Sequence, residues 1–171
     1  LLYADHFPYR QVETARDVRQ SPVHDRLKAA GACFGEVSGW ERANWFLPRA
    51  EHERGLKPRY EYSWKRQNWF DYSAKEHLAV RERVGMFDMS SFGKIRVVGR
   101  DAEAVLQRIA ANDVAVKPGK IVYTQFLNEA GRIEADVTVS RLSPDEFLVV
   151  TPAATVRRDL HWITGHIPDD A

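Results

Sequence analysis

The feature that most constrains the fold is a run of three β-strands separated by very short loops. Apolar and β-branched residues predict strands over 121–127, 132–140 and 146–151. The loops that join them lie at 128–131 and around 143–145. Connections this short join antiparallel neighbours, because parallel strands need a crossover of a dozen or more residues. The sequence therefore predicts an antiparallel sheet.

Helix signals flank these strands, so the predicted fold class is α+β, an antiparallel sheet with flanking helices. Ser21 suits a helix N-cap, and Ser73 with Glu76 has the spacing of a capping box. A further strand is predicted over 93–98. The predicted helices are about 21–30, about 74–84, a helix that Asp101 caps and that buries Val105, Leu106 and Ile109, and about 155–164.

Composition divides the chain into two parts. Four of the five tryptophans lie between Trp40 and Tyr72, and the charged stretch 51–58 contains Gly and Pro, which predicts a loop. We therefore predict an irregular, aromatic-rich segment over 1–57, in which residues 33–45 are either strand-like or irregular, and the sheet domain over 58–171. Packing is the favoured interpretation of the aromatic cluster, and stacking on a ring cofactor is the alternative.

Composition also argues against several classes of protein. A net charge of +1 is not typical of a nucleic-acid binder, and no apolar run approaches the ~20 residues that span a membrane. The single cysteine cannot form an intrachain disulfide. His161 and His166 lack neighbours at metal-ligand spacing, so no metal site is expected. Ser21, His24 and Asp25 contain the letters of a hydrolytic triad, but a helix start explains Ser21 better.

One face of the predicted hairpin collects polar side chains. A four-residue loop at 128–131 would place Tyr123 directly opposite Asp136. The spacing leaves two interpretations open, a small-molecule surface or a solvated sheet face, and by itself it favours the second. The residues predicted to share this face are Ile121, Tyr123, Gln125, Glu134, Asp136 and Thr138. Those predicted to face the core are Ile133, Ala135, Val137 and Val139.

Several motifs occur in the order found in a known family. They are RVGMFDMSSFGKIRV at 83–97, NDV at 112–114, PG at 118–119, YT at 123–124, NEAG at 128–131, IEADVTV at 133–139 and DEFLV at 145–149. Together they resemble the opening of the folate-binding domain of the glycine-cleavage T-protein (aminomethyltransferase), over about residues 70–165. The T-protein often has two consecutive acidic residues where this chain has Ala135 and Asp136.

The motifs further upstream resemble a different protein region. They are HFP at 6–8, RQSPVHDRL at 19–27, GACFG at 31–35 and GWERANWF at 39–46. They are similar to the segment that joins the FAD-dependent amine-oxidising domain to the folate domain in dimethylglycine and sarcosine dehydrogenases and their oxidase relatives. The resemblance implies that 1–57 ends the FAD-oxidoreductase region and that 58–171 begins the aminomethyltransferase-like domain. The rest of both domains would lie outside this chain.

The resemblance also implies a function. In that family FAD oxidises an N-methyl amine, and tetrahydrofolate captures the one-carbon unit as 5,10-methylenetetrahydrofolate. Asp136 would be the catalytic carboxylate, and Tyr123, Asp136 and Thr138 would bind folate. Tetrahydrofolate is thus the expected cofactor of this segment and FAD that of the missing upstream domain. The expected partners are a small N-methyl amine and folate, with no nucleic acid and no membrane, in the bacterial cytoplasm or the mitochondrial matrix.

Two alternatives remain beside this prediction. One is a stand-alone glycine-cleavage aminomethyltransferase, which the segment at 39–42 disfavours. The other is a non-catalytic module that binds folate or serves as a scaffold. If the dehydrogenase interpretation holds, the isolated 171-residue chain carries half a folate site and is expected to be inactive.

Overall fold

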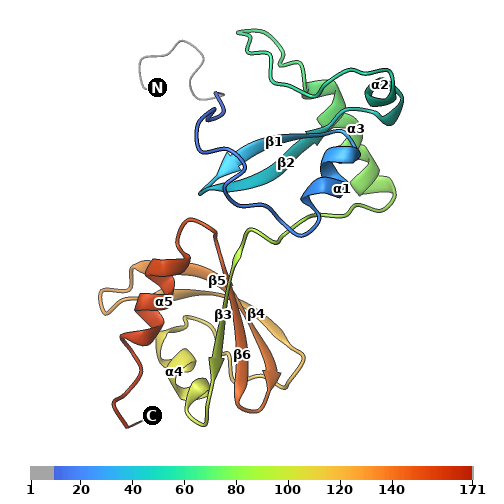
Figure 1. The fold of residues 1–171 in the computed structure, drawn as a ribbon. Helices are drawn as coiled ribbons and strands as arrows, with labels where there is room; N and C mark the ends of the chain where they lie inside the picture. Colours follow the sequence, from blue (N-terminus) through green and yellow to red (C-terminus); the bar gives the residue numbers. More distant parts are fainter. Residues whose placement is uncertain (1–9, 171) are drawn as a thin grey trace. The chain divides into compact units, whose positions relative to one another are not determined.

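The computed structural model describes residues 10–170, so the HFP motif at 6–8 lies outside the described residues. The chain forms two compact units, which divide between Ser91 and Phe92 (Figure 1). Helices accompany antiparallel sheets in both, which confirms the predicted α+β class. The structural division falls later than the boundary expected at 57/58, because residues 58–91 group with the first unit. The assignment of 1–57 and 58–171 to two protein families stays a prediction.

A β-hairpin forms the centre of the first unit, where the sequence predicted either strand-like or irregular structure. Strand β1 (Ala32–Val37) pairs with β2 (Trp40–Phe46) in antiparallel register. Ser38 and Gly39 form the two-residue turn with φ values of 53° and 82°. Two positive φ values are what a type I′ turn requires, and this turn matches the twist of the strands it joins. Of the two interpretations left open for residues 33–45, strand-like or irregular, the strand-like one is confirmed.

The helices of this unit differ from their predicted bounds. Helix α1 (His24–Ala29) begins after Ser21, and Gly31 with φ of 89° follows its end. Helix α2 (Arg49–Glu53) lies in the stretch predicted as a loop. Short helices are hard to predict because they present less than two turns of periodicity.

Helix α3 (Phe70–Glu82) begins four residues earlier than predicted. Ser73 therefore lies inside the helix, and the predicted capping box is wrong. The Glu76 carboxylate instead accepts a hydrogen bond from the backbone N–H of Phe46 over 2.7 Å. The Glu76 carboxylate, which the local pattern assigned to a helix cap, thus makes a tertiary contact with β2.

Aromatic packing stabilises the hairpin. Trp45 is almost fully buried, and its ring stacks on that of Tyr72 with centroids 5.3 Å apart. Tyr60 approaches the same ring edge-on at 6.4 Å. Cys33 is buried beside Trp45, and desolvation raises the pKa of its thiol to about 11. The packing interpretation of the aromatic cluster is confirmed for these rings.

The second unit is a four-stranded antiparallel sheet with two helices. The strand order is β3-β6-β5-β4, and each neighbouring pair is antiparallel, as predicted. Helices α4 and α5 bury side chains against one face of this sheet. The elements are β3 (Gly93–Val98), α4 (Ala102–Ile109), β4 (Ile121–Leu127), β5 (Ile133–Ser143), β6 (Glu146–Thr151) and α5 (Val156–Thr164).

The core of the second unit is contiguous and apolar. Leu106 of α4, Phe126 of β4 and Phe147 of β6 are fully buried in it. The predicted helix face of Val105, Leu106 and Ile109 is buried, as are Ala135, Val137 and Val139. Ile133 is an exception and the prediction for it is wrong, since it is 67% exposed. A β-bulge between Phe126 and Leu127 breaks the alternation at that end of the hairpin.

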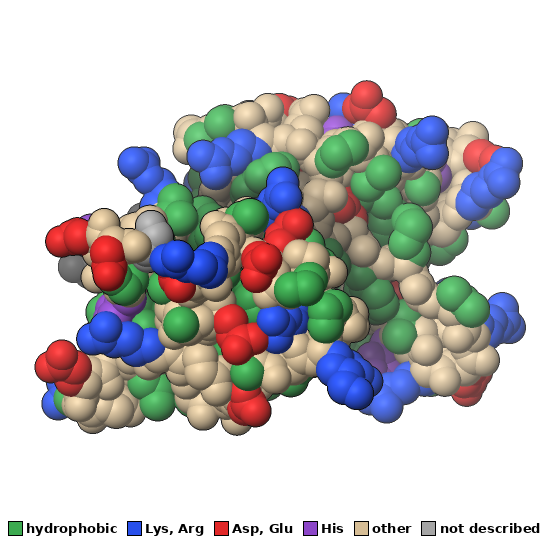
Figure 2. All heavy atoms as spheres, turned by 90° about the horizontal axis from the view of Figure 1, so that it is seen from below, with side chains coloured by type: hydrophobic (Ala, Val, Ile, Leu, Met, Phe, Trp, Pro, Cys, Tyr) green, Lys and Arg blue, Asp and Glu red, His purple; other side chains and the backbone are tan. Residues whose placement is uncertain are grey.

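Charges of both signs are spread over the surface. Figure 2 shows Lys and Arg side chains interspersed with Asp and Glu side chains on one face. This agrees with the near-neutral net charge of +1. Within residues 10–170, no helix has the length and apolar character that crossing a membrane would need.

Candidate functional site

The central hairpin brings the predicted site residues together in a register that differs from the predicted one. Tyr123 pairs with Thr138, and Gln125 pairs with Asp136. The predicted direct pairing of Tyr123 with Asp136 is therefore wrong by two residues. One residue of this shift comes from the bulge, since Leu127 pairs with Ile133, and the other from a loop shorter than predicted, in which the Asn128 backbone N–H donates to the carbonyl of Arg132. A shift of two preserves the direction of every side chain, so the predicted grouping on one face survives.

We call the side of the sheet that bears Tyr123, Gln125, Asp136 and Thr138 the open face. The Asp136 carboxylate is exposed on it, and Tyr123 is 60% exposed. Gln125 and Thr138 are half-buried beside them. Alternate residues of the same strands, such as Phe126 and Val137, point into the core. The side chains of the open face therefore point away from the core.

Two side chains of β4 contact the Asp136 carboxylate. The Gln125 Nε2 donates a hydrogen bond to Asp136 Oδ1 over 3.1 Å. The Tyr123 hydroxyl also hydrogen-bonds to the carboxylate, and this bond is the main reason why the pKa of Tyr123 is raised above 10.0. At neutral pH the hydroxyl is therefore protonated and able to donate. The arrangement offers an exposed carboxylate with an amide and a phenol held beside it.

The turn next to this cluster is fixed by its own hydrogen bonds. The Asn128 Oδ1 accepts from the backbone N–H groups of Ala130 and Arg132, at 3.0 Å each. The Asn128 Nδ2 donates to Glu134 Oε1 over 2.7 Å. Glu134 is thereby occupied, which leaves Asp136 as the carboxylate at the centre of the open face. Such a group can accept ring N–H donors by charge-assisted hydrogen bonds and can accept a proton.

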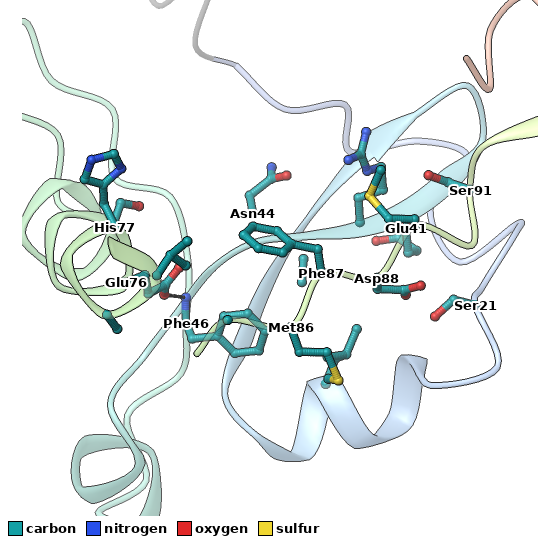
Figure 3. A pocket seen from close by; sticks show the side chains of 18 of the residues that line it. Ser21, Glu41, Asn44, Phe46, Glu76, His77, Met86, Phe87, Asp88 and Ser91 are labelled. Carbon is teal, nitrogen blue, oxygen red and sulfur yellow. Dashed lines mark hydrogen bonds between the residues drawn. The ribbon is translucent and has the colours of Figure 1, made fainter. Parts of the chain in front are cut away.

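A separate cavity of about 550 Å³, which no sequence pattern predicted, lies within the first unit (Figure 3). Its walls come from α3, from β2 and from residues 84–91, and they are largely apolar. Glu76 contributes a carboxylate whose pKa is raised, chiefly by burial. The Ser91 hydroxyl lines the cavity as a buried group without a hydrogen-bond partner. Leu27 of α1 and Ser21 also line it, so the site combines residues from several separate segments, and no local pattern predicts such a combination.

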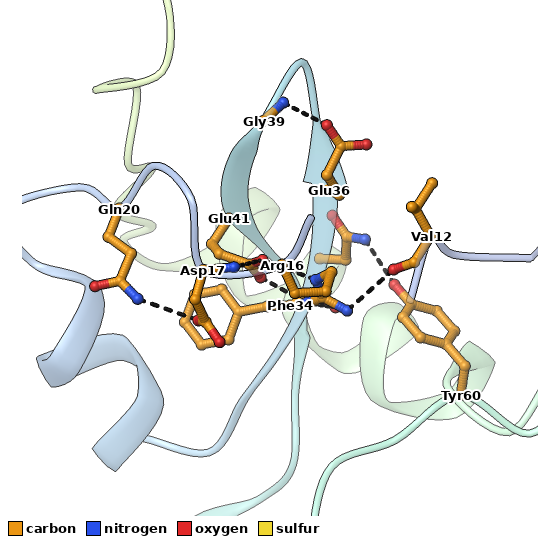
Figure 4. A network of polar contacts seen from close by, with 10 residues as sticks. Val12, Arg16, Asp17, Gln20, Phe34, Glu36, Gly39, Glu41 and Tyr60 are labelled. Atoms are coloured by element: carbon orange, nitrogen blue, oxygen red, sulfur yellow. Dashed lines mark hydrogen bonds and ion pairs between the residues drawn. The ribbon is translucent and has the colours of Figure 1, made fainter. Parts of the chain in front are cut away.

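A buried ion pair organises the segment before α1 (Figure 4). The Glu41 carboxylate accepts from Arg16 Nε over 2.7 Å and from the Asp17 backbone N–H over 2.8 Å. The hydrogen bond with Arg16 lowers the pKa of Glu41, whose side chain is only 1% exposed. Arg16 also donates to the carbonyl of Phe34 on β1. These contacts tie the N-terminal segment to the hairpin, and their role is structural.

Metal ligation has little support in the part of the chain that the structure describes. Residues 10–170 contain no group of three or more His, Cys, Asp or Glu side chains that could hold a metal ion. His161 is exposed on α5, as predicted. The His166 Nδ1 lies 2.7 Å from the carbonyl oxygen of Trp162.

Comparison with known proteins supplies the family. A family described as the GCVT N-terminal domain matches residues 23–171. The chain is 51% identical over 162 residues to 4-methylaminobutanoate oxidase (formaldehyde-forming) of Paenarthrobacter nicotinovorans, covering 95% of this chain and 19% of that protein. It is 36% identical over 161 residues to human mitochondrial sarcosine dehydrogenase, covering 83% of this chain and 18% of that protein. The chain thus spans about a fifth of the length of these curated relatives.

The fold agrees with the sequence comparison. The crystal structure of glycine cleavage system aminomethyltransferase T from Bartonella henselae matches with a TM-score of 0.67 and 25% identity. The match covers 87% of this chain and 35% of that one. The predicted resemblance to the T-protein and to the N-methyl amine dehydrogenases is confirmed. The chain belongs to the GCVT N-terminal domain family.

Proposed function

We propose that the chain is part of a flavin-dependent N-methyl amine oxidase or dehydrogenase, and that its open face binds tetrahydrofolate. Two relatives act by name on N-methyl amino acids, namely 4-methylaminobutanoate and sarcosine. The observation that carries the folate proposal is the exposed Asp136 carboxylate, held by Gln125 and Tyr123 on the open face. We assign FAD and the amine-oxidising step to residues outside this chain.

The donor and acceptor groups of the open face fit a reduced pterin. Tetrahydrofolate supplies ring N–H groups and the two nitrogen atoms that take up the one-carbon unit, giving 5,10-methylenetetrahydrofolate. Asp136 offers the acceptor that such N–H groups need, and the hydroxyl groups of Tyr123 and Thr138 offer both donors and acceptors. The exposure of Asp136 and Tyr123 leaves these groups accessible to a ligand.

Asp136 has the catalytic role in this proposal. As an ionised carboxylate it orients a ligand N–H by a charge-assisted hydrogen bond and accepts the proton that must leave. Tyr123 acts as a donor, because a phenol keeps its proton at neutral pH, and the bond to Asp136 raises its pKa further from neutrality. Thr138 lies directly opposite Tyr123 and widens the binding surface.

The test uses the full-length protein and the substitution Asp136→Ala. One-carbon capture by tetrahydrofolate should fall about 100-fold, the lower end of the range for loss of a general acid or base. Reduction of the flavin by the amine should stay within about twofold of wild type, because that step occurs elsewhere. Stopped-flow flavin absorbance measures the second quantity, and product analysis for methylenetetrahydrofolate against free formaldehyde measures the first.

The control is Glu129→Ala, which removes an exposed carboxylate from the turn that follows β4. It should leave both quantities unchanged. If Asp136→Ala still couples amine oxidation to folate as wild type does, the assignment of Asp136 is wrong. If the wild-type protein binds no tetrahydrofolate by calorimetry, the folate proposal as a whole is wrong and a scaffold role replaces it.

A further inference from the structure

The contacts around Asp136 assign a role to a neighbour that the sequence placed on the same face but left without a function. We propose that Gln125 is a positioning residue, whose side-chain amide fixes the orientation of the Asp136 carboxylate. The inference rests on the proposed catalytic role of Asp136. By donating to Oδ1, the amide restricts the rotation of the carboxylate, which keeps further lone pairs for the ligand.

The first argument is the pairing of the two strands. Gln125 lies directly opposite Asp136 in the β4–β5 register, and its Nε2 donates to Oδ1 over 3.1 Å. Side chains in directly opposed positions have Cβ atoms about 5 Å apart, so this contact is built into the register. Gln125 is half-buried, whereas Asp136 is exposed. The side chain of Gln125, which donates the hydrogen bond, is therefore more constrained than the side chain of Asp136, which accepts it.

The second argument is that the backbone of β4 is fixed on its outer side. β4 is an edge strand, and an uncovered edge leaves its backbone groups unpaired. Here residues 110–112 cover it. The backbone N–H of Ala111 donates to the carbonyl of Gln125 over 2.8 Å, and Asn112 Nδ2 donates to the carbonyl of Tyr123 over 2.7 Å. Gln125 is thus anchored on both sides of its strand.

The chemistry of the amide suits this role. A carboxylamide donates a hydrogen bond without adding a charge, so Asp136 keeps its full negative charge for the ligand. A Lys or Arg in the same place would form an ion pair and weaken the carboxylate as a proton acceptor. A carboxylate that rotates freely would lose orientation, and misplacement by about 1 Å can cost about 100-fold in rate.

The titratable groups that face Asp136 are few. Tyr123 lies on β4, and its pKa is raised mainly by the hydrogen bond to Asp136. Glu134 lies on β5 itself, and Asn128 occupies one of its oxygens. On the other side, the pairing of β5 with β6 begins at Thr138 and Val150, so β6 places no paired residue opposite Asp136. A carboxyl group introduced at position 125 would therefore titrate chiefly against Asp136.

The experiment compares two substitutions in the full-length protein. Gln125→Met keeps the length of the side chain and removes its hydrogen bond. Gln125→Glu keeps the shape but repels Asp136 at high pH. As the pH falls toward about 6, two adjacent carboxyl groups share one proton, and the protonated Glu can donate to Asp136 as the amide did.

Two readouts are measured between about pH 6 and pH 8. They are tetrahydrofolate binding by anaerobic calorimetry and the rate of one-carbon capture. Gln125→Met should lower the capture rate about tenfold at every pH, with flavin reduction unchanged. Gln125→Glu should show a similar loss at pH 8 and recover at least half of it near pH 6. A residue with only a structural role would give the same loss at both pH values.

Gln20→Met is the matched control, because Gln20 Nε2 donates to Asp17 Oδ1 over the same 3.1 Å in the first unit. It should leave binding and capture unchanged. The positioning role is overturned if Gln125→Met captures the one-carbon unit at the wild-type rate. It is also overturned if the loss of capture in Gln125→Glu does not depend on pH. Either result leaves the proposed function intact if Asp136→Ala abolishes capture. If Asp136→Ala also leaves folate binding and one-carbon capture unchanged, both the positioning role of Gln125 and the proposed function are overturned.

Discussion

The two units are stabilised by different interactions. The second unit has a contiguous apolar core, to which its sheet and both helices contribute. In the first unit the buried cluster consists of Cys33, Trp45 and Leu47, with aromatic rings packed against it. Helix α3 of this unit buries none of its residues, while the charged Glu41 is buried. Apolar burial dominates one unit, and polar and aromatic contacts carry more of the other.

This difference has a consequence for function. The proposed folate residues lie on the unit with the close-packed core, where interdigitated side chains fix the positions of β4 and β5. An exposed site on a rigid sheet keeps its geometry without help from a ligand. The first unit contains the ion pair between Arg16 and the buried Glu41, so its stability should respond to charge and pH. The predictions that follow test this contrast.

The largest effect is expected in the core of the second unit. Phe126 is fully buried, so Phe126→Ala should destabilise this unit by about 4 kcal/mol. Hydrogen exchange followed by mass spectrometry measures the effect separately on peptides of each unit. Phe70→Ala in the first unit is the control, because Phe70 is 45% exposed and its loss should cost less than about 1 kcal/mol. If Phe126→Ala and Phe70→Ala reduced the stability of their units equally, the proposed contrast in packing would be wrong.

The next effect is expected at the ion pair of the first unit. Arg16→Met leaves the Glu41 carboxylate buried without its guanidinium, which should cost about 3 kcal/mol. Urea unfolding measures the change, and hydrogen exchange should place it in the hairpin. The control is Arg49→Met, because Arg49 and Glu53 form a pair whose side chains are 90% and 59% exposed. That substitution should change stability by less than about 0.5 kcal/mol.

The smallest effect is a dependence of the first unit on acid. The hydrogen bond with Arg16 lowers the pKa of Glu41 below the ordinary value of 4.5, so the unfolded chain binds a proton before the folded one does. The stability that this pair contributes is therefore complete above pH 4.5 and is lost as the pH falls through the folded-state value. In urea unfolding, the difference in the free energy of unfolding between wild type and Glu41→Gln should become smaller below pH 4.5. A difference that stays constant in acid would contradict the role of the charge.

Strands were easier to predict than helices in this chain. The bounds of β3, β4 and β6 match the predicted ranges, because alternation of apolar residues is a local signal that buried sheets preserve. The start of α3 was wrong, since Glu76 hydrogen-bonds to Phe46 of β2 and not to its own helix start. A contact between residues that lie far apart in the chain overrides a local propensity.

The sequence by itself determined which residues of the central hairpin share a face. The two-residue period of a strand placed Tyr123, Asp136 and Thr138 together, and this grouping survives because the observed register differs from the predicted one by an even number of residues. The family motifs predict a folate-binding role for these residues, and that role stays a prediction.

Only the tertiary structure decided which residue touches which. A bulge beside Phe126 and a loop shorter than predicted together moved the register by two, so Gln125 became the partner of Asp136. Glu41 found Arg16 across 25 positions of chain, and no periodicity connects residues that far apart. Such pairs depend on how the chain folds back on itself, because direct contacts follow from three-dimensional proximity and not from spacing in the sequence.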